Sequence, residues 1–245
     1  MSIRSSHAFL DVPAAAESGA AAFWGRALGW PLGEPEPDHP EFRSFEPGGT
    51  ATPYVHLQRI EGPARIHLDL AVDAVPEERE RLVGLGAVAV EETSDWQVMR
   101  SPGGLPFCLV PASPEARPPS VQWDDGHRSR LVQVCIDSPA ALHDAEVRFW
   151  RAATEWSFRE STAPQFAGKL AAPPGSPLQL LLQRLDEDDS GEATRAHLDL
   201  GTDDLDLEVS RLRALGAELI GPGDGWVALR DPAGLAFCAT LNTPG

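Results

Sequence analysis

The chain contains little cysteine. Three cysteines, Cys108, Cys135 and Cys238, occur among its 245 residues, and no two of them form a closely spaced pair. An odd, widely spaced set predicts neither a disulfide framework nor a zinc site built from thiolate pairs, and it is typical of a reducing compartment. We therefore predict a cytoplasmic location.

Long apolar runs and positive charge are also scarce. The longest apolar runs, such as 178–182, fall far short of the roughly 20 residues that cross a bilayer, and no cationic-then-apolar leader opens the chain. Lys and Arg number 20 against 37 Asp and Glu, which gives a net charge of −17. Because phosphate groups are bound mainly by Lys and Arg, we predict neither nucleic acid nor membrane as a partner. The acidity is typical of a soluble protein, and attraction of a cationic ligand is the alternative.

The most informative feature that is present is an internal repeat. The run R-I-H-L-D-L at 65–70 recurs as R-A-H-L-D-L at 195–200, an offset of 130 residues (195 − 65 = 130). The same offset relates four further matches: L-G-A at 85 and 215, Trp at 96 and 226, P-x-G-L at 102 and 232, and F-C at 107 and 237. Five features at one offset indicate that the chain is a duplication.

The segment 113–128 separates the two copies. It is rich in Pro, Ser and acidic residues and has little apolar periodicity, which is the composition of a linker. Since domains commonly have roughly 100–150 residues, the length of the chain agrees with two. We therefore predict one domain at 1–112 and a second at 129–245.

Each half contains two strand–helix–strand units. In the first half the predicted elements are a strand at 7–12, a helix at 13–28 that ends at Gly29, strands at 42–45, 54–60 and 65–72, a helix at 76–85, and a hairpin of 96–99 and 106–110. The second half repeats this plan, with a first helix at 139–154 and a second at 204–215. One unit alone has too little apolar surface to be stable, so two units are expected to pair in each half. The predicted fold class is α+β.

Alternation places polar side chains on one face of the repeated strand. Arg65, His67 and Asp69 point to one side, and the aliphatic residues between them point to the other, where a helix is expected to cover them. Buried polar groups need partners, so the polar face is the candidate site. We predict that a ligand contacts this face, its copy in the second half, and two tryptophans that open the closing hairpins: Arg65, His67, Asp69, Arg195, His197, Asp199, Trp96 and Trp226.

The same alternation brings imidazoles and a thiol to the interior face of the first half. His7, His56 and Cys108 are the additional candidates. Histidine and cysteine are ligands of zinc, and histidine with carboxylate suits iron or manganese, so a divalent metal site is admissible here. Leu131 and Leu181 stand at the places of His7 and His56 in the second half, so those positions do not supply three ligands there.

Structural roles are the alternative for several of these residues. His67 and His197 are then histidines bonded to an Asp or Arg of their own strand. Cys108 and Cys238 are then small core residues, each next to a phenylalanine. Four tryptophans at helical spacing are predicted to pack each first helix on its sheet: Trp24, Trp30, Trp150 and Trp156.

The repeated R-x-H-L-D-L strand, the L-G-A helix end and the hairpin D-P-A-G-L-A-F-C at 231–238 together resemble the vicinal oxygen chelate superfamily, which includes glyoxalase I, extradiol dioxygenases and bleomycin-type drug-binding proteins. The resemblance is closest to its glyoxalase-like branch and covers nearly the whole chain, twice. It implies tandem glyoxalase-like domains, each of two paired βαβββ modules that form a curved β cup with the helices outside.

The resemblance also implies a metal site. In the metal enzymes of the superfamily, the first strand of each module supplies a histidine and the last strand a carboxylate to one divalent ion. Carried onto the first half, this implies one zinc, iron, manganese or nickel ion held by His7, by Gln58 or its same-face neighbour His56, and by His67, with Cys108 in the place of the final carboxylate. The matching residues of the second half are Leu131 or Gln133, Gln183 or Leu181, His197 and Cys238.

Two functions follow from this interpretation. The first is a small-molecule-binding protein without the metal chemistry of glyoxalase I, which sequesters a small cationic or aromatic compound. The alternative is a divalent-metal-dependent lyase, isomerase or dioxygenase that acts on a small oxygenated substrate in the first domain. Cysteine in place of the final carboxylate favours the first. Two domains in one chain are expected to serve as a monomer, with a homodimer as the alternative.

Overall fold

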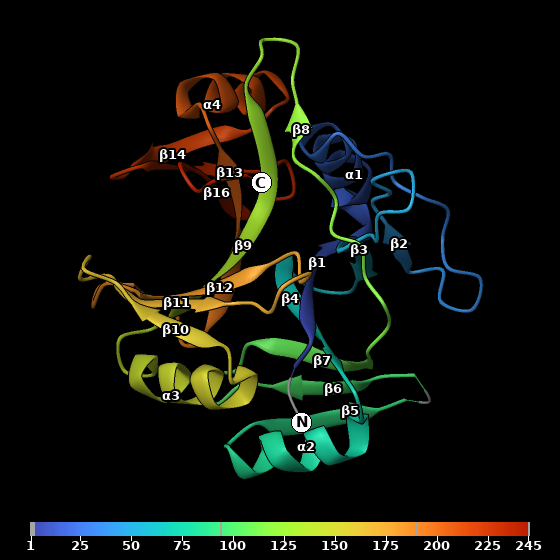
Figure 1. Cartoon of the computed structure of the whole chain (residues 1–245), viewed down its shortest axis with the longest axis vertical. Helices are drawn as coiled ribbons and strands as arrows, with labels where there is room; N and C mark the ends of the chain where they lie inside the picture. Colours follow the sequence, from blue (N-terminus) through green and yellow to red (C-terminus); the bar gives the residue numbers. More distant parts are fainter. Residues whose placement is uncertain (1–2, 94, 190, 245) are drawn as a thin grey trace. The chain divides into compact units, whose positions relative to one another are not determined.

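The computed structural model describes residues 3–93, 95–189 and 191–244, which form two mixed sheets and four helices (Figure 1). In the first half the elements are β1 (Ser5–Pro13), α1 (Ala14–Leu28), β2 (Phe42–Ser44), β3 (Val55–Ile60), β4 (Arg65–Val72), α2 (Val75–Gly84), β5 (Val88–Glu92), β6 (Gln97–Arg100) and β7 (Pro106–Pro111). Those that follow are β8 (Val121–Gln122), β9 (Arg128–Ser138), α3 (His143–Thr154), β10 (Ser157–Glu160), β11 (Phe166–Ala171), β12 (Gln179–Arg184), β13 (Arg195–Thr202), α4 (Leu205–Ala214), β14 (Glu218–Pro222), β15 (Trp226–Arg230) and β16 (Ala236–Thr240).

The two sheets share one strand order, to which the second sheet adds the edge strand β10. The first runs β2-β3-β1-β4-β7-β6-β5, and the second runs β10-β11-β12-β9-β13-β16-β15-β14, with β8 paired to β9. Three of the four modules in the described residues are βαβββ, and the first, β1-α1-β2-β3, has one strand fewer. The predicted α+β class is confirmed. The sequence analysis did not predict five strands, β5, β8, β10, β11 and β14. The residues of β5 and β14 are mostly exposed, so they lack the apolar alternation by which a strand is recognised.

Contacts divide the chain into two compact units. Unit 1 contains the start of the chain to Ala8, His67–Glu115 and Val134–Ala196, and unit 2 contains Phe9–Ile66, Ala116–Gln133 and the chain from His197 onward. Unit 1 therefore holds α2 of the first repeat with α3 of the second, and unit 2 holds α1 with α4. The predicted domain boundaries, at residues 112 and 129, divide the chain by its sequence repeat, whereas each compact unit combines parts of both repeats. These boundaries stay a prediction.

A buried tryptophan at the centre of the first helix of a module packs on a phenylalanine in each unit. In unit 2 the ring centroids of Trp24 and Phe237 lie 5.2 Å apart, and in unit 1 those of Trp150 and Phe107 lie 5.6 Å apart. All four predicted core tryptophans are buried, which confirms their packing role. Rings at these distances bury large apolar areas and interact favourably beyond that burial.

In each unit an arginine of one helix donates hydrogen bonds to the last carbonyls of the other helix. In unit 2, Arg211 of α4 donates to the carbonyls of Arg26 and Ala27 at 3.2 and 3.0 Å, while Glu208 accepts two of its other hydrogen bonds. In unit 1, Arg81 of α2 donates in the same way to the end of α3 and to Glu78. The last carbonyls of a helix have no partner within the helix, so a partly buried cation there stabilises both helices.

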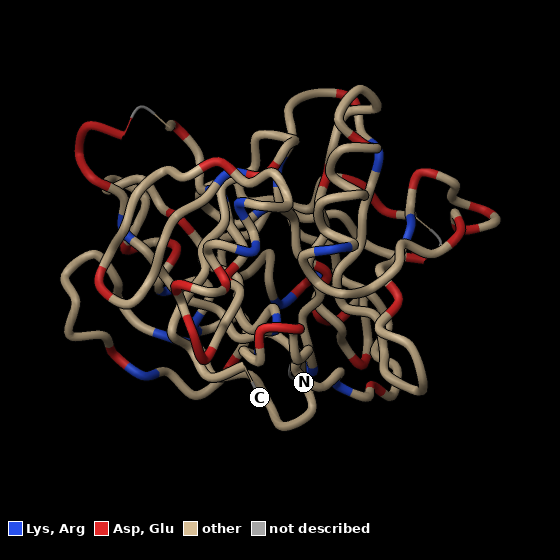
Figure 2. The backbone as a smooth tube through the Cα atoms, turned by 90° about the horizontal axis from the view of Figure 1, so that it is seen from above, with Lys and Arg blue, Asp and Glu red and all other residues tan. Residues whose placement is uncertain are grey.

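Acidic positions are spread along the whole trace of the chain in Figure 2, in keeping with the excess of Asp and Glu. Cys108, Cys135 and Cys238 are free thiols. Among the described residues, no helix is long and apolar enough to cross a membrane.

Candidate functional site

The repeated strand and the last strand of its module run side by side in both units. β4 pairs with β7 in parallel, and this register sets Asp69 opposite Cys108. β13 pairs with β16 in the same way and sets Asp199 opposite Cys238. Because neighbouring residues of a parallel ladder share a face, and because residues i and i+2 of a strand do too, each pairing also brings a histidine of the repeated strand to the same face.

In unit 1 this register assembles His67, Asp69 and Cys108, which we call the unit 1 triad. A ligand atom of each residue lies within 4.8 Å of the others, and His67 Nε2 lies 3.5 Å from Asp69 Oδ1. His67 is buried. Burial raises the pKa of the Cys108 thiol, and the nearby imidazole of His67 only partly opposes this. The triad thus offers a nitrogen, an oxygen and a sulfur donor in a partly buried position.

In unit 2 the register assembles the unit 2 triad of His197, Asp199 and Cys238, again with one ligand atom of each within 4.8 Å. His197 Nε2 lies 3.3 Å from Asp199 Oδ1 and 3.5 Å from Cys238 Sγ. Gln133 of β9 donates from Nε2 to Asp199 Oδ2, which fixes the carboxylate. The sequence analysis counted ligands at the positions of His7 and His56, and so it missed that the second half carries the same three residue types.

One carboxylate oxygen of each triad accepts no hydrogen bond among the described residues, although the histidine nitrogen of the triad lies 3.3–3.5 Å from it. These two oxygens, Asp69 Oδ1 and Asp199 Oδ1, are buried. A buried carboxylate oxygen without a partner is costly, by about 1–3 kcal/mol or more, and the same defect in two copies indicates a shared requirement. Zn²⁺ is bound by His nitrogen, carboxylate oxygen and Cys sulfur, so the donor set of each triad fits a divalent ion.

His7, a predicted metal ligand, contacts a carboxylate that the sequence analysis did not include. His7 Nε2 lies 3.1 Å from Glu115 Oε1, and Ser5 donates to the same oxygen at 2.5 Å. Burial raises the pKa of Glu115, but the hydrogen bonds from His7 and Ser5 outweigh it, so that this pKa lies below its ordinary value. Glu115 was missed because it lies in the predicted linker, where acidic residues are read as solvated.

His56 and Gln58, the other predicted metal ligands, lie on β3. His56 Nδ1 is 2.9 Å from Ser44 Oγ, and its ring stacks on Phe9 with centroids 4.5 Å apart. Gln58 lies opposite Phe42 in the pairing of β3 with β2. Within the described part of the chain, His67 and the candidate Cys108 fall in a triad, whereas His7, His56 and Gln58 do not.

The predicted arginines are held by carboxylates. Arg65 Nε donates to the fully buried Asp11 at 2.8 Å. Arg195 forms a double hydrogen bond with Asp189, at 2.9 and 2.5 Å, and this partner lowers the pKa of Asp189 to about 2. These arginines are therefore engaged with carboxylates of their own unit.

The two predicted tryptophans lie at the start of the closing hairpins. Trp96 precedes β6, and Trp226 begins β15 opposite Thr240. Both are partly exposed. Their contact with a ligand stays a prediction.

Comparison with known proteins gives one family and one fold. A family model described as a glyoxalase-like domain matches residues 7–110 and again 133–240. A Mn(II)-bound glyoxalase from Novosphingobium aromaticivorans has a similar structure, with a TM-score of 0.67 and 17% identity over 98% of this chain and 82% of that chain. The 2,2',3-trihydroxybiphenyl 1,2-dioxygenase from Sphingomonas wittichii strain RW1 gives 0.66 and 11% over 98% and 90%. No curated protein matches the sequence.

Proposed function

Because the chain belongs to the glyoxalase-like domain family of the vicinal oxygen chelate superfamily, as its repeats predicted, we propose that it binds a small oxygenated molecule at divalent metal ions held by its two triads. His67, Asp69 and Cys108 would hold one ion, and the second triad would hold another. Three protein ligands leave a coordination position open for a small molecule. The ion, when bound, supplies Lewis acidity to an oxygen of that molecule.

The observation that carries the proposal is the pair of buried carboxylate oxygens, Asp69 Oδ1 and Asp199 Oδ1, that accept no hydrogen bond from the described residues. Each lies beside a histidine nitrogen and a cysteine sulfur. A cation satisfies such an oxygen at short range, whereas the histidine nitrogen beside it lies 3.3–3.5 Å away. Zinc suits this donor set best, since a thiolate and an imidazole are its usual ligands.

In this proposal the chain itself orients the ligands. Gln133 holds the second oxygen of Asp199, so that Oδ1 faces His197 and Cys238. Parallel pairing holds the cysteine opposite the aspartate in each unit. Donors fixed by neighbouring hydrogen bonds bind metal more tightly than donors that must first be ordered.

A metal-free binding protein is the second candidate. It is favoured by the contact of Cys238 Sγ with His197 Nε2 at 3.5 Å, in which the two side chains partly satisfy each other. In that case the triads orient a small cationic or aromatic ligand and no ion is needed.

Metal analysis separates these candidates. Protein purified without chelator and without a nickel column, then loaded with zinc and desalted, is expected to hold about two ions per chain. His67→Ala and His197→Ala should each hold one, and the double variant none. His39→Gln, which changes a histidine outside both triads, serves as the matched control and should hold two. Protein that holds no zinc, iron, manganese or nickel after loading would exclude the metal proposal and leave the binding protein.

Two further features of the protein are proposed with it. A cytoplasmic location is supported by the three free thiols. A functional monomer is supported by the presence of both triads in one chain, and a light-scattering mass well above 26.3 kDa would show a homodimer instead.

A further inference from the structure

One position of the repeat differs between the two triads. The two matches of the family model begin at His7 and Gln133, an offset of 126 residues (133 − 7 = 126), and the F-W pair of the first helix recurs at the same offset, at 23 and 149. His7 lies on β1, which neighbours β4, and Gln133 lies on β9, which neighbours β13. Each residue therefore stands beside the strand that carries the histidine and the aspartate of a triad.

In unit 2 the side chain at this position fixes the aspartate. Gln133 is buried, and its Nε2 donates a hydrogen bond to Asp199 Oδ2. Asp199 Oδ1, which accepts no hydrogen bond among the described residues, lies 3.3 Å from His197 Nε2. Because Oδ2 is bonded to the amide, the carboxylate presents a single oxygen, Oδ1, to an ion in the triad.

In unit 1 the side chain at this position is directed to the segment that follows β7. His7 Nε2 lies 3.1 Å from Glu115 Oε1, and Ser5 Oγ donates to the same oxygen at 2.5 Å. This nitrogen of His7 is thus engaged by a carboxylate outside the triad, whereas the amide of Gln133 is engaged by a carboxylate of its own triad.

The oxygen and sulfur donors also differ in exposure. The side chain of Asp69 is 16% exposed, whereas that of Asp199 is 3% exposed. Cys108 is partly exposed, and Cys238 is buried. The two histidines differ in the opposite sense, at 7% in unit 1 and 14% in unit 2. The carboxylate and the thiol of the unit 1 triad are therefore closer to water than those of the unit 2 triad.

We propose that Gln133 is a positioning residue for Asp199 that makes the unit 2 triad the tighter of the two metal sites, while the unit 1 triad exchanges its ion more readily. The inference rests on the proposed function, because it concerns the same two ions. A ligand that is already oriented loses less conformational entropy when the ion binds. Hydrogen bonds that orient metal ligands commonly contribute about 10–100-fold to metal affinity. Zinc in short supply is therefore expected to fill unit 2 first.

Zinc competition with a chromophoric chelator measures the two sites one at a time. His67→Ala leaves the unit 2 site, and His197→Ala leaves the unit 1 site. The Kd for zinc is expected to be about 10–100-fold lower at the unit 2 site. In the His67→Ala protein, Gln133→Leu keeps a side chain of similar size but removes the amide, and it should raise this Kd by about 10–100-fold.

Three further variants sharpen the test. Gln133→Asn keeps an amide and should recover part of the affinity that Gln133→Leu loses. Gln122→Leu makes the same change at an exposed residue of unit 2 and should leave the Kd unchanged. In the His197→Ala protein, His7→Gln places an amide beside β4 and should lower the Kd of the unit 1 site about tenfold, because the amide can then hold Asp69.

Melting temperatures of the metal-free proteins separate positioning from a structural role. If Gln133→Leu lowers the melting temperature but leaves the Kd for zinc unchanged, Gln133 only stabilises the fold and the proposal is wrong. Equal Kd values at the two sites would also overturn it, while leaving the proposed function in place. If Gln133→Leu does not fold, the comparison of the two sites and the His7→Gln variant still decide. Protein that binds zinc at neither site would overturn both proposals.

Discussion

In each compact unit the N–H of a buried tryptophan donates a hydrogen bond to a carboxylate, but the carboxylate comes from a different structural element in the two units. In unit 1 the carboxylate comes from the helix itself, because Glu146 of α3 accepts from Trp150 Nε1 at 2.7 Å and from the backbone N–H of Gly103 at 2.6 Å. In unit 2 it comes from the hairpin turn, because Asp231 accepts from Trp24 Nε1 at 2.7 Å and from the backbone N–H of Leu235 at 2.8 Å.

At the matching positions of the two repeats, the acidic residue stands on the helix in one case and in the hairpin turn in the other. Ala20 stands on α1 where α3 has Glu146, and Ser101 stands in the first turn where the second has Asp231. Ser101 Oγ accepts from the N–H of Leu105 at 3.0 Å, just as Asp231 does from Leu235. Burial raises the pKa of both carboxyl groups. The fold therefore requires one buried acceptor between helix and turn, and either element can provide it.

The largest expected effect comes from removing that acceptor. Glu146→Ala leaves the indole N–H of Trp150 and the N–H of Gly103 without partners, and it should lower the free energy of unfolding by about 2–4 kcal/mol. Ser101→Asp alone should also destabilise, because it adds a second buried carboxylate next to Glu146. Combined in one chain, the two changes should recover most of the loss, since they reproduce the arrangement of unit 2.

Urea unfolding of the four proteins in this cycle measures the coupling between the sites. Glu146→Gln, which keeps the shape and an acceptor oxygen, is the control and should lose less than Glu146→Ala. Additive losses in the double variant would show that the two units do not use interchangeable acceptors.

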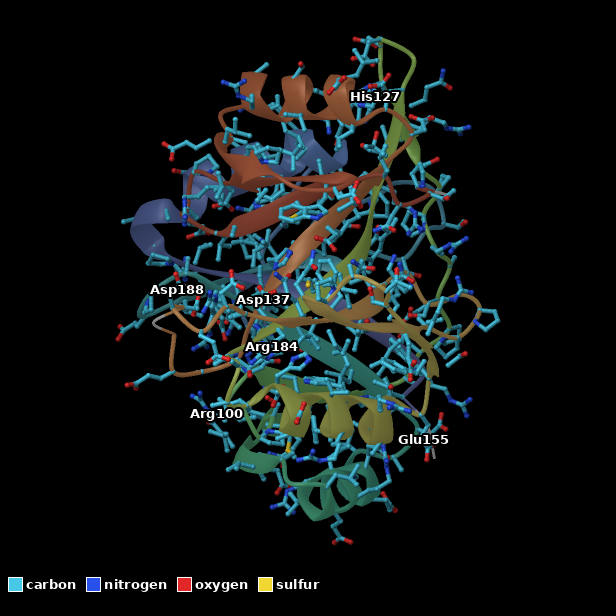
Figure 3. All side chains as sticks on the ribbon, turned by 90° about the vertical axis from the view of Figure 1, so that its left-hand side faces the viewer. Arg100, His127, Asp137, Glu155, Arg184 and Asp188 are labelled. Atoms are coloured by element: carbon cyan, nitrogen blue, oxygen red, sulfur yellow. The ribbon has the colours of Figure 1, made fainter. Side chains whose placement is uncertain are left out.

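A smaller effect is expected in the pH dependence of stability, through a buried histidine of unit 2. In unit 2 the buried His127 lies at the turn before β9 beside α4 (Figure 3), with Nε2 2.7 Å from Glu208 Oε2 and Nδ1 against Asp125, while Arg211 also contacts Glu208. Burial lowers the pKa of His127, but the hydrogen bonds to Glu208 and Asp125 outweigh it and hold this pKa above 6.5. The pKa of His127 is higher in the folded protein than in the unfolded chain, where it is about 6.5. The stabilisation by His127 is therefore complete at pH values below 6.5, and it is lost as the pH rises through the pKa of the folded protein.

His127→Gln should therefore cost about 1–2 kcal/mol at pH 5.5 and progressively less at higher pH. Melting temperatures from pH 5 to 9 check this, with His39→Gln, a change at a partly exposed histidine, as the matched control. Parallel curves for the His127 variant and the unaltered protein would contradict the assignment.

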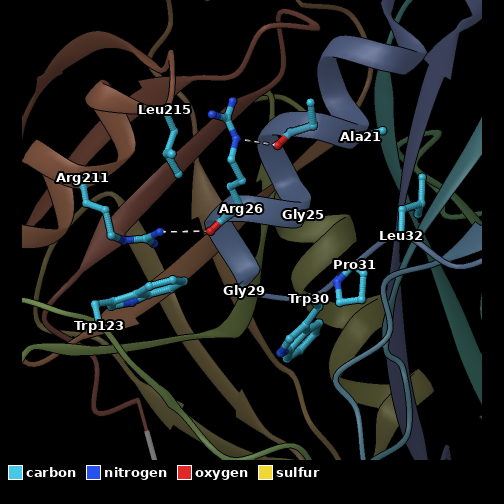
Figure 4. A pocket seen from close by; sticks show the side chains of 11 residues that line it. Ala21, Gly25, Arg26, Gly29, Trp30, Pro31, Leu32, Trp123, Arg211 and Leu215 are labelled. Atoms are coloured by element: carbon cyan, nitrogen blue, oxygen red, sulfur yellow. Dashed lines mark hydrogen bonds between the residues drawn. The ribbon is translucent and has the colours of Figure 1, made fainter.

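The smallest expected effect concerns the ends of α1 and α3. Both helices end in a left-handed residue, Gly29 with φ 71° and Glu155 with φ 55°. Figure 3 shows Glu155 at the end of α3, and Figure 4 shows Gly29 at the end of α1. Glycine adopts this conformation without steric cost, so Glu155→Gly should raise the free energy of unfolding by about 0.5–1 kcal/mol. Gly29→Ala should lower it, because the new Cβ also approaches Trp123. Chemical denaturation of both variants measures the difference, and a loss of stability in Glu155→Gly would show that its side chain stabilises unit 1.

Much of the fold was predictable from local patterns. The strand predicted at 65–72 has the bounds of β4, and the helix predicted at 13–28 differs from α1 by one residue. Apolar alternation and glycine at a helix end are properties of neighbouring residues, which explains this accuracy. β5 escaped prediction because Val88 and Val90 are about half exposed, with no apolar face for a pattern to show.

The candidate site was predictable only in part. Alternation along one strand placed His67 and Asp69 on a common face, and the repeat pointed to His197 and Asp199. Whether Cys108 lies beside Asp69 depends on the register between β4 and β7, which are far apart in the sequence. Glu115 next to His7 was missed for the same reason, since an acidic residue in a linker carries no local sign of its partner.

The sequence by itself determined the duplication, the order of strands and helices, and the residue types that face inward, because each of these is encoded by short-range periodicity or by direct self-similarity. Only the tertiary structure decided which module shares a compact unit with which. Unit 1 joins α2 with α3 and unit 2 joins α1 with α4, although the repeat divides the chain between α2 and α3. Contacts such as that of Trp24 with Asp231 join residues of different repeats, and no local pattern specifies such a partner.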